Sequence, residues 1–132
     1  MTNNSNTPLQ ELIKIEVDAR DYGFDWPHED MIIEQAISEC EEVRAAIRDQ
    51  EPRHRIQEEI GDLLHTAISL CLFAGFDPDE TLKIISNKFG SRLNDVKKLA
   101  SQRGLTTLKG QSFDFMLELW QEVKQMETKK NA

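Results

Sequence analysis

Two pairs of acidic residues, separated by a helix-breaking segment, constrain the fold of this chain more than any other feature. The first pair is Glu39 and Glu42, and the second is Glu59 and Asp62. Residues three positions apart lie on the same face of a helix. The segment Asp49–Pro52 between the pairs is typical of a tight connection between two helices. The spacing therefore predicts a helical hairpin that brings four carboxylates to one point.

The acidic pairs lie beside the apolar stripes of the two helices, not within them. At about 100° per residue, the apolar stripes contain Ile33, Ile37, Cys40, Val43 and Ile47 in one helix, and Ile56, Ile60, Leu63, Leu64, Ala67 and Cys71 in the next. The face that carries Glu59 and Asp62 continues through Thr66, Ser69 and Phe73. A chain with 24 acidic residues forms such pairs by chance, usually on a solvated face. A solvated face would, however, stay charged along its whole length. The change from acidic to small to aromatic residues indicates a face that points inward.

Four converging carboxylates raise each other's pKa unless a positive charge lies among them. Ligand sets made only of oxygen favour hard cations. The pattern therefore predicts a site for Mg²⁺, with Mn²⁺ as a substitute.

The helical periods extend over most of the chain and predict an all-α fold. A length of 132 residues indicates one domain. We expect a disordered tail at 1–7, a domain over 8–127 and a second tail at 128–132. The expected helices cover about 8–22, 28–49, 53–74, 78–103 and 113–127. They predict a four-helix bundle with an additional C-terminal helix.

Charge and composition limit the partners of the chain. A net charge of −8 disfavours a nucleic-acid partner. No apolar run approaches 18 residues, and no signal peptide is apparent, so we expect no membrane contact and a cytoplasmic location. Cys40 and Cys71 lie in the apolar stripes and are expected to be buried thiols in a reducing compartment. The large aliphatic surface predicts a homodimer.

Two aromatic residues, Phe24 and Trp26, lie in the loop after the first helix. They could cover the end of the bundle. Alternatively, they could line a pocket for a flat ligand, because aromatic faces stack on nucleobases.

These features together resemble a known family, the MazG nucleotide pyrophosphohydrolases. The likeness covers about residues 19 to 126, and it is carried by the following segments: Gly23-Phe-Asp-Trp-Pro27, Glu39-x-x-Glu42, Glu59-Ile-Gly-Asp-Leu-Leu64, Asn87-Lys-Phe89 with Arg92, and Leu117-Glu-Leu-Trp-Gln-Glu-Val-Lys124. The resemblance implies Mg²⁺ held by the four acidic residues. It also implies hydrolysis of a (deoxy)nucleoside triphosphate to the monophosphate and pyrophosphate, as in cleaning of the nucleotide pool, by a homodimer or a dimer of dimers.

The resemblance also assigns roles to basic residues. Lys88 and Arg92 match the basic positions of the family and would hold the β- and γ-phosphates. Arg55, one turn before Glu59, is expected to add to the same positive charge. For each of these, an ordinary surface cation is the alternative.

Two positions depart from the family pattern. Ser38 replaces the first acidic residue of the EExxE motif, and either Glu58 or a hydroxide on the metal could take over its role. Ser86 replaces a frequent asparagine, with Asn87 beside it.

Other functions remain open. The same architecture serves dUTP and dCTP pyrophosphatases and phosphoribosyl-ATP pyrophosphatase, and the sequence does not identify the base. A catalytically weakened, metal-stabilised helical dimer that only binds nucleotides is a further alternative.

Overall fold

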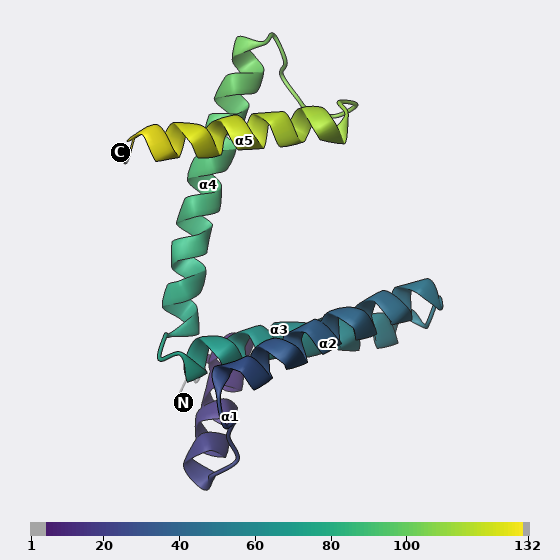
Figure 1. Ribbon diagram of the computed structural model, residues 1–132, viewed down its shortest axis with the longest axis vertical. Coiled ribbons are helices and arrows are strands. Elements are labelled where there is room, and N and C mark those ends of the chain that lie inside the picture. The colour runs from purple at the N-terminus through teal and green to yellow at the C-terminus, as the bar shows by residue number, and fades with distance from the viewer. Residues whose placement is uncertain (1–4, 131–132) are drawn as a thin grey trace. The chain divides into compact units, whose positions relative to one another are not determined.

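The computed structural model describes residues 5–130, which form five α-helices and no strand (Figure 1). The helices are α1 (Pro8–Tyr22), α2 (Glu29–Arg48), α3 (Arg53–Phe73), α4 (Pro78–Gln102) and α5 (Phe113–Lys130). The all-helical prediction is confirmed. Residues 128–130 continue α5 beyond the helix end expected near residue 127. The tails at 1–7 and 128–132 stay predictions, and their residues 1–4 and 131–132 lie outside the described residues.

The first helix shows how local sequence sets the helix ends. Thr7 caps α1, because its hydroxyl accepts a hydrogen bond from the Gln10 backbone N–H while the Gln10 side chain accepts one from the Thr7 backbone. Gly23 ends the helix with a φ of 104°, a left-handed conformation that glycine adopts without a steric penalty.

The chain forms two compact units, the first ending at Thr81 and the second beginning at Leu82. Within the first unit, α2 and α3 form a hairpin and lie side by side, and α1 contacts α3 (Figure 1). Gln50, with a φ of 52°, makes the turn between α2 and α3. The single domain, the bundle of four helices and the dimer stay predictions.

The inward faces of α2 and α3 differ from those expected. The fully or nearly fully buried residues are Ile32 and Ala46 in α2, and Thr66 and Ser69 in α3. The predicted apolar stripes instead remain largely accessible on this unit, with Ile37 52% and Leu64 61% exposed.

The prediction that Cys40 is buried is therefore wrong for this unit. Cys40 is exposed because α2 turns another side, which carries Ile32, Gln35, Glu39 and Ala46, into the hairpin. Cys71 is partly buried, and its Sγ lies 3.2 Å from Thr81 Oγ1. Both cysteines are free thiols.

The second unit has an apolar core between α4 and α5. Its buried residues are Val96, Ala100, Leu119 and Val123. The Arg103 guanidinium, in the turn directly after α4, donates a hydrogen bond to Glu122 of α5 at 2.6 Å.

No single helix in residues 5–130 is long and apolar enough to cross a membrane. Among these residues, only α3 and α4 counted together as a bent pair have the length and composition of a membrane-spanning segment.

Candidate metal centre and adjoining cavity

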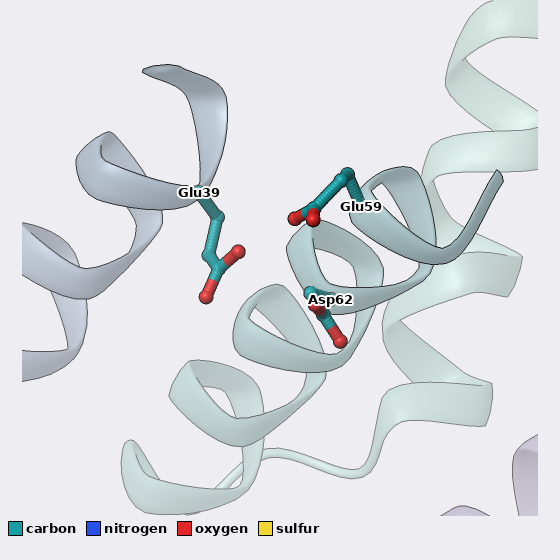
Figure 2. Close-up of side chains that lie close together, drawn as sticks. All are labelled: Glu39, Glu59 and Asp62. Carbon is teal, nitrogen blue, oxygen red and sulfur yellow. The ribbon is translucent and has the colours of Figure 1, made fainter. Parts of the chain in front are cut away.

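Three carboxylates from the α2–α3 hairpin face one another. Figure 2 shows Glu39 on α2 pointing toward Glu59 and Asp62 on α3. One ligand oxygen from each lies within 4.8 Å of the others. Glu39 and Glu59 are half-buried and Asp62 is exposed, so the group opens to solvent on one side. An arrangement of oxygen donors alone fits a hard divalent cation.

A neighbouring side chain orients Glu39, and another contacts the backbone of Asp62. The Gln35 side-chain amide, one turn before Glu39, donates a hydrogen bond to Glu39 Oε1 at 2.7 Å. On α3, the Thr66 hydroxyl donates to the Asp62 backbone carbonyl at 2.9 Å. The Glu39 carboxylate therefore has a fixed partner before any ion binds.

Arg55 supplies the positive charge nearest to the cluster. Its guanidinium donates to Glu59 Oε1 at 3.0 Å and to Glu58 Oε2 at 2.5 Å, and it lies 3.8 Å from Glu51. The hydrogen bond with Glu58, and then the charges of all three carboxylates, raise the pKa of Arg55. Arg55 is thus engaged by acidic side chains on both sides, and its predicted contact with phosphate stays a prediction.

The fourth predicted ligand is not part of this cluster. Glu42 is exposed on α2, and the three-carboxylate group does not include it. Ser38 is also exposed, and the Glu58 carboxylate is held by Arg55. The structure therefore brings three of the four predicted acidic residues together.

The predicted phosphate-binding residues Lys88 and Arg92 belong to the second unit. Arg92 makes a forked contact with Glu127, at 2.9 Å from Nε and 3.0 Å from Nη2, and lies over the Trp120 ring. The hydrogen bond that Arg92 donates to Glu127 raises the pKa of Arg92. Lys88, like Ser86 and Asn87, is exposed on α4. Binding of phosphate by these residues stays a prediction.

A cavity of about 630 Å³ adjoins the acidic cluster within the first unit. Its volume lies in the range of small-molecule sites, roughly 300–1,000 Å³. Phe24 and Trp26 line it together with Glu39 and Asp62. The other lining residues are Ile15, Glu16, Ala19, Asp25, Gln35, His65, Thr66 and Ser69. The aromatic loop and the acidic cluster therefore share one cavity.

The polar floor of this cavity was not among the predicted site residues. Glu16 of α1 accepts hydrogen bonds from Ser69 Oγ and His65 Nε2 of α3. The Arg20 guanidinium donates to the Ser69 carbonyl at 2.8 Å. The only signal in the sequence is that Glu16 and Arg20 lie one turn apart on the first helix, so the two charged side chains share one face.

The part of the chain that contains the acidic cluster matches a known protein family. The model of the MazG nucleotide pyrophosphohydrolase domain matches residues 28–97, more than half of the chain. The chain belongs to the MazG family. The match contains Glu39, Glu59 and Asp62 but stops short of α1, which contributes Glu16 to the cavity.

Curated MazG relatives are similar along most of this chain. The nucleoside triphosphate pyrophosphohydrolase of Escherichia coli K12 is 31% identical over 123 residues, which are 90% of this chain and 45% of the relative. The nucleoside triphosphate pyrophosphohydrolase/pyrophosphatase MazG of Thermotoga maritima is 30% identical over 84% of this chain and 42% of its own length. The chain thus spans less than half of the length of these relatives.

Proposed function

We propose that this chain is a metal-dependent nucleoside triphosphate pyrophosphohydrolase that converts a (deoxy)nucleoside triphosphate to its monophosphate and pyrophosphate. One observation carries the proposal: in a member of the MazG family, three carboxylates have oxygens within 4.8 Å of one another, and two of them, Glu39 and Asp62, line a cavity that Phe24 and Trp26 also line. Removal of unwanted nucleotides from the cellular pool is the role that fits this activity.

The residues that would hold Mg²⁺, or Mn²⁺ in its place, are Glu39, Glu59 and Asp62, with Glu42 as a further ligand. A divalent ion bound there supplies neutralisation of phosphate charge and a lowered pKa of bound water. The donor set fits such an ion because every donor is a carboxylate oxygen.

The protein side chains bind and position the substrate. In this proposal Phe24 and Trp26, which line the cavity, stack on the nucleobase, and the phosphates lie near Glu39 and Asp62, which line the same cavity. The Gln35 amide holds the Glu39 side chain in one orientation, so that side chain loses less conformational entropy when the site binds its ligands.

The reaction consumes one water and breaks the bond between the α-phosphorus and the oxygen that bridges it to the β-phosphorus. The water attacks the α-phosphorus in line with the departing pyrophosphate. Glu58 is a poor candidate for the base that accepts the water proton, because its carboxylate is bonded to Arg55. Glu39 and Asp62 of the cluster line the cavity proposed for the substrate, whereas Glu58 does not, so they are better placed than Glu58 to accept the proton.

The exposed apolar stripes support a homodimer in this proposal. Ile33, Ile37 and Ile47 on α2, and Ile60 and Leu64 on α3, are each more than 40% exposed on the first unit. Burying such side chains stabilises an assembly by about 25 cal/mol per Å². The free thiols Cys40 and Cys71 are consistent with a reducing, cytoplasmic compartment.

A pyrophosphate-release assay tests the proposed activity. Purified protein with Mg²⁺ and a panel of ribo- and deoxyribonucleoside triphosphates should release pyrophosphate and the matching monophosphate, which chromatography identifies. Release of orthophosphate with a nucleoside diphosphate would place the cleaved bond elsewhere. Metal-dependent nucleotide binding without any turnover would favour a binding module instead.

A further inference from the structure

Arg20, near the end of α1, connects the aromatic loop at residues 23–27 to α3. Its side chain is only 18% exposed, although α1 contains no buried residue. Because no apolar side chain of α1 is buried, the placement of the loop that follows this helix depends in part on polar contacts. The contacts of the Arg20 guanidinium are therefore the ones to trace.

On one side, the Arg20 guanidinium contacts α3. Its Nη2 donates a hydrogen bond to the Ser69 backbone carbonyl at 2.8 Å, and its Cζ lies 5.7 Å from the centre of the Phe73 ring, within the range of cation–π attraction. Arginine can make both contacts because its guanidinium is planar and presents several donors in fixed directions. These contacts fix the guanidinium on the helix that also carries Asp62 of the acidic cluster.

On the other side, the Arg20 guanidinium faces the aromatic loop. Its Nε lies 3.5 Å from Asp25 Oδ1, and the same oxygen accepts a hydrogen bond from the Trp26 backbone N–H at 2.7 Å. Within residues 5–130, the side chains of the loop make no other hydrogen bond or ion pair. The Asp25 carboxylate therefore connects Arg20 with the backbone of Trp26.

The Nε–H of Arg20 favours this connection. The nitrogen is buried and, among the described residues, has no hydrogen-bond partner. The acidic atoms within 4 Å of it are Asp25 Oδ1 at 3.5 Å and Glu16 Oε2 at 3.7 Å. A buried donor without a partner is unfavourable. The attraction between Arg20 and Asp25 therefore stabilises the loop conformation in which the carboxylate stays beside Nε.

We infer that Arg20 is a positioning residue of the nucleotide site: through Asp25 it holds Trp26 at the cavity, where the indole stacks on the base. The inference rests on the proposed function for the presence of a nucleotide in the cavity. Asp25 and Trp26 line the cavity, whereas Arg20 is not among its lining residues. Arg20 therefore acts on the ligand through Trp26 and not by contact with the phosphates.

A double-mutant cycle tests whether Arg20 acts through Trp26. Isothermal titration calorimetry measures the dissociation constants of the four common deoxynucleoside monophosphates in Mg²⁺. Arg20→Gln and Trp26→Ala should each weaken binding about tenfold, because each loses stacking on the base. The double variant should bind little worse than either single variant, since both changes remove one contact.

Three results of this cycle would overturn the inference. The first is an unchanged affinity in either single variant. The second is a double variant about a hundredfold weaker than the parent, because independent effects multiply. The third is a parent that binds none of the four nucleotides at millimolar concentration.

Inorganic pyrophosphate distinguishes positioning of the base from contact with phosphate. Pyrophosphate has no base to stack, so its affinity in Mg²⁺ should change less than about twofold in Arg20→Gln. A loss as large as that for the nucleotides would mean that Arg20 contacts phosphate or supports the whole site, and would contradict the assignment. Arg44→Gln, at an exposed position of α2, removes the same charge and should leave both affinities unchanged.

A second variant leaves the contacts of Arg20 with α3 in place. Asp25→Ala removes the loop end of the connection and should reproduce the selective loss of nucleotide affinity. In a Trp120→Phe background, Trp26 is the remaining tryptophan, and both Asp25→Ala and Arg20→Gln should increase quenching of its fluorescence by acrylamide. Thermal melts show whether each variant is folded. Unchanged quenching and affinity in folded Asp25→Ala would contradict the inference.

Pyrophosphate release from nucleoside triphosphates separates this inference from the proposed function. Arg20→Gln should raise KM about tenfold and change kcat little, since stacking on the base is the same in the bound substrate and in the transition state. Release by the parent together with multiplied effects in the cycle sustains the activity and removes the positioning role. A cycle that behaves as expected without any release sustains the positioning role and removes the activity.

Discussion

The two units of the chain bury different kinds of side chain. In the second unit, α4 and α5 enclose Val96, Ala100, Leu119 and Val123, as amphipathic helices ordinarily do. In the first unit, α3 buries Thr66 and Ser69, while Ile60 and Leu64 on the same helix remain largely exposed. The partner helix α2 buries the apolar Ile32 and Ala46, so the polar buried face belongs to α3 alone, and its residues Thr66 and Ser69 line the cavity. The buried side chains of α4 and α5 are aliphatic and contribute to stability.

The largest expected effect tests the ligand site of the first unit. Asp62→Asn and Glu59→Gln should each lower the rate of pyrophosphate release about a thousandfold, because each loses several kcal/mol of ion-dependent stabilisation. Steady-state kinetics at saturating Mg²⁺ measure the loss. Helicity and melting temperature should change little, since both side chains face a solvent-accessible cluster.

Two further variants serve as controls for this first prediction. Glu41→Gln, exposed on α2 and outside the cluster, should retain activity. Glu42→Gln reports on the predicted fourth ligand. A loss equal to that of Glu59→Gln would mean that Glu42 joins the site when an ion is bound.

The second prediction concerns the core of the second unit. Leu119 is fully buried, and Leu119→Ala should lower the free energy of unfolding by about 3 kcal/mol through lost burial and a residual cavity. Ser69→Ala, which removes a buried hydroxyl from the first unit, should cost only about 1 kcal/mol. Chemical denaturation measures both. A larger loss for Ser69→Ala would reverse the contrast between the two units.

The third prediction tests whether the apolar outer face of the hairpin is an interface between two copies. Leu64→Lys places a charge among exposed aliphatic residues and should weaken dimerisation roughly a hundredfold, because the side chain occurs twice in a symmetric contact. Sedimentation velocity over a range of concentrations gives the dissociation constant. Met126→Lys, at an exposed position of α5, is the comparison. A parent protein that is monomeric at micromolar concentration would contradict the dimer.

The fourth prediction tests the orientation of the Glu39 carboxylate separately from its charge. Gln35→Leu removes the amide that holds Glu39 and keeps a side chain of similar size, so the Mg²⁺ concentration for half-maximal activity should rise about tenfold. The rate at saturating Mg²⁺ should fall much less. A purely structural role for Gln35 would instead lower the melting temperature and leave the Mg²⁺ dependence unchanged.

The smallest effect is a pH dependence in the second unit. The hydrogen bond from Arg92 lowers the pKa of Glu127 below its ordinary value of 4.5. A depressed pKa in the folded state contributes stability that is fully present above the unfolded value and is lost as the pH falls through the folded one. The melting temperature of the parent should therefore exceed that of Glu127→Gln at neutral pH, and the difference should shrink below pH 4.5. A constant difference down to the most acidic pH would contradict this.

Local signals in the sequence were sufficient for the helices. Capping at Thr7 and Pro8, the break before Pro52 and glycines such as Gly23 and Gly75 depend on nearest neighbours, so the ends could be predicted within a few residues. The end of α5 deviates most among the predicted C-terminal ends, by three residues, because the polar residues after Glu127 carry no stop signal.

The site was predictable only in part, for a physical reason. The spacing of Glu39, Glu59 and Asp62 follows from helical geometry, and these three converge. Periodicity alone cannot show which face a helix turns to its neighbour, so the apolar stripes were expected inside and lie outside in this unit. Contacts such as Glu16 with Ser69 join residues far apart in sequence and arise only from the docking of α1 on α3.

The contacts of Arg55 have a consequence for how the site is filled. The Arg55 guanidinium already donates a hydrogen bond to Glu59. A metal ion that binds Glu59 therefore has to compete with this positive charge. The hairpin can then stay closed while empty, without the repulsion that would push its two helices apart. Arg55 also contacts Glu58 and Glu51, so displacement from Glu59 would leave its guanidinium held by two other carboxylates beside the cluster.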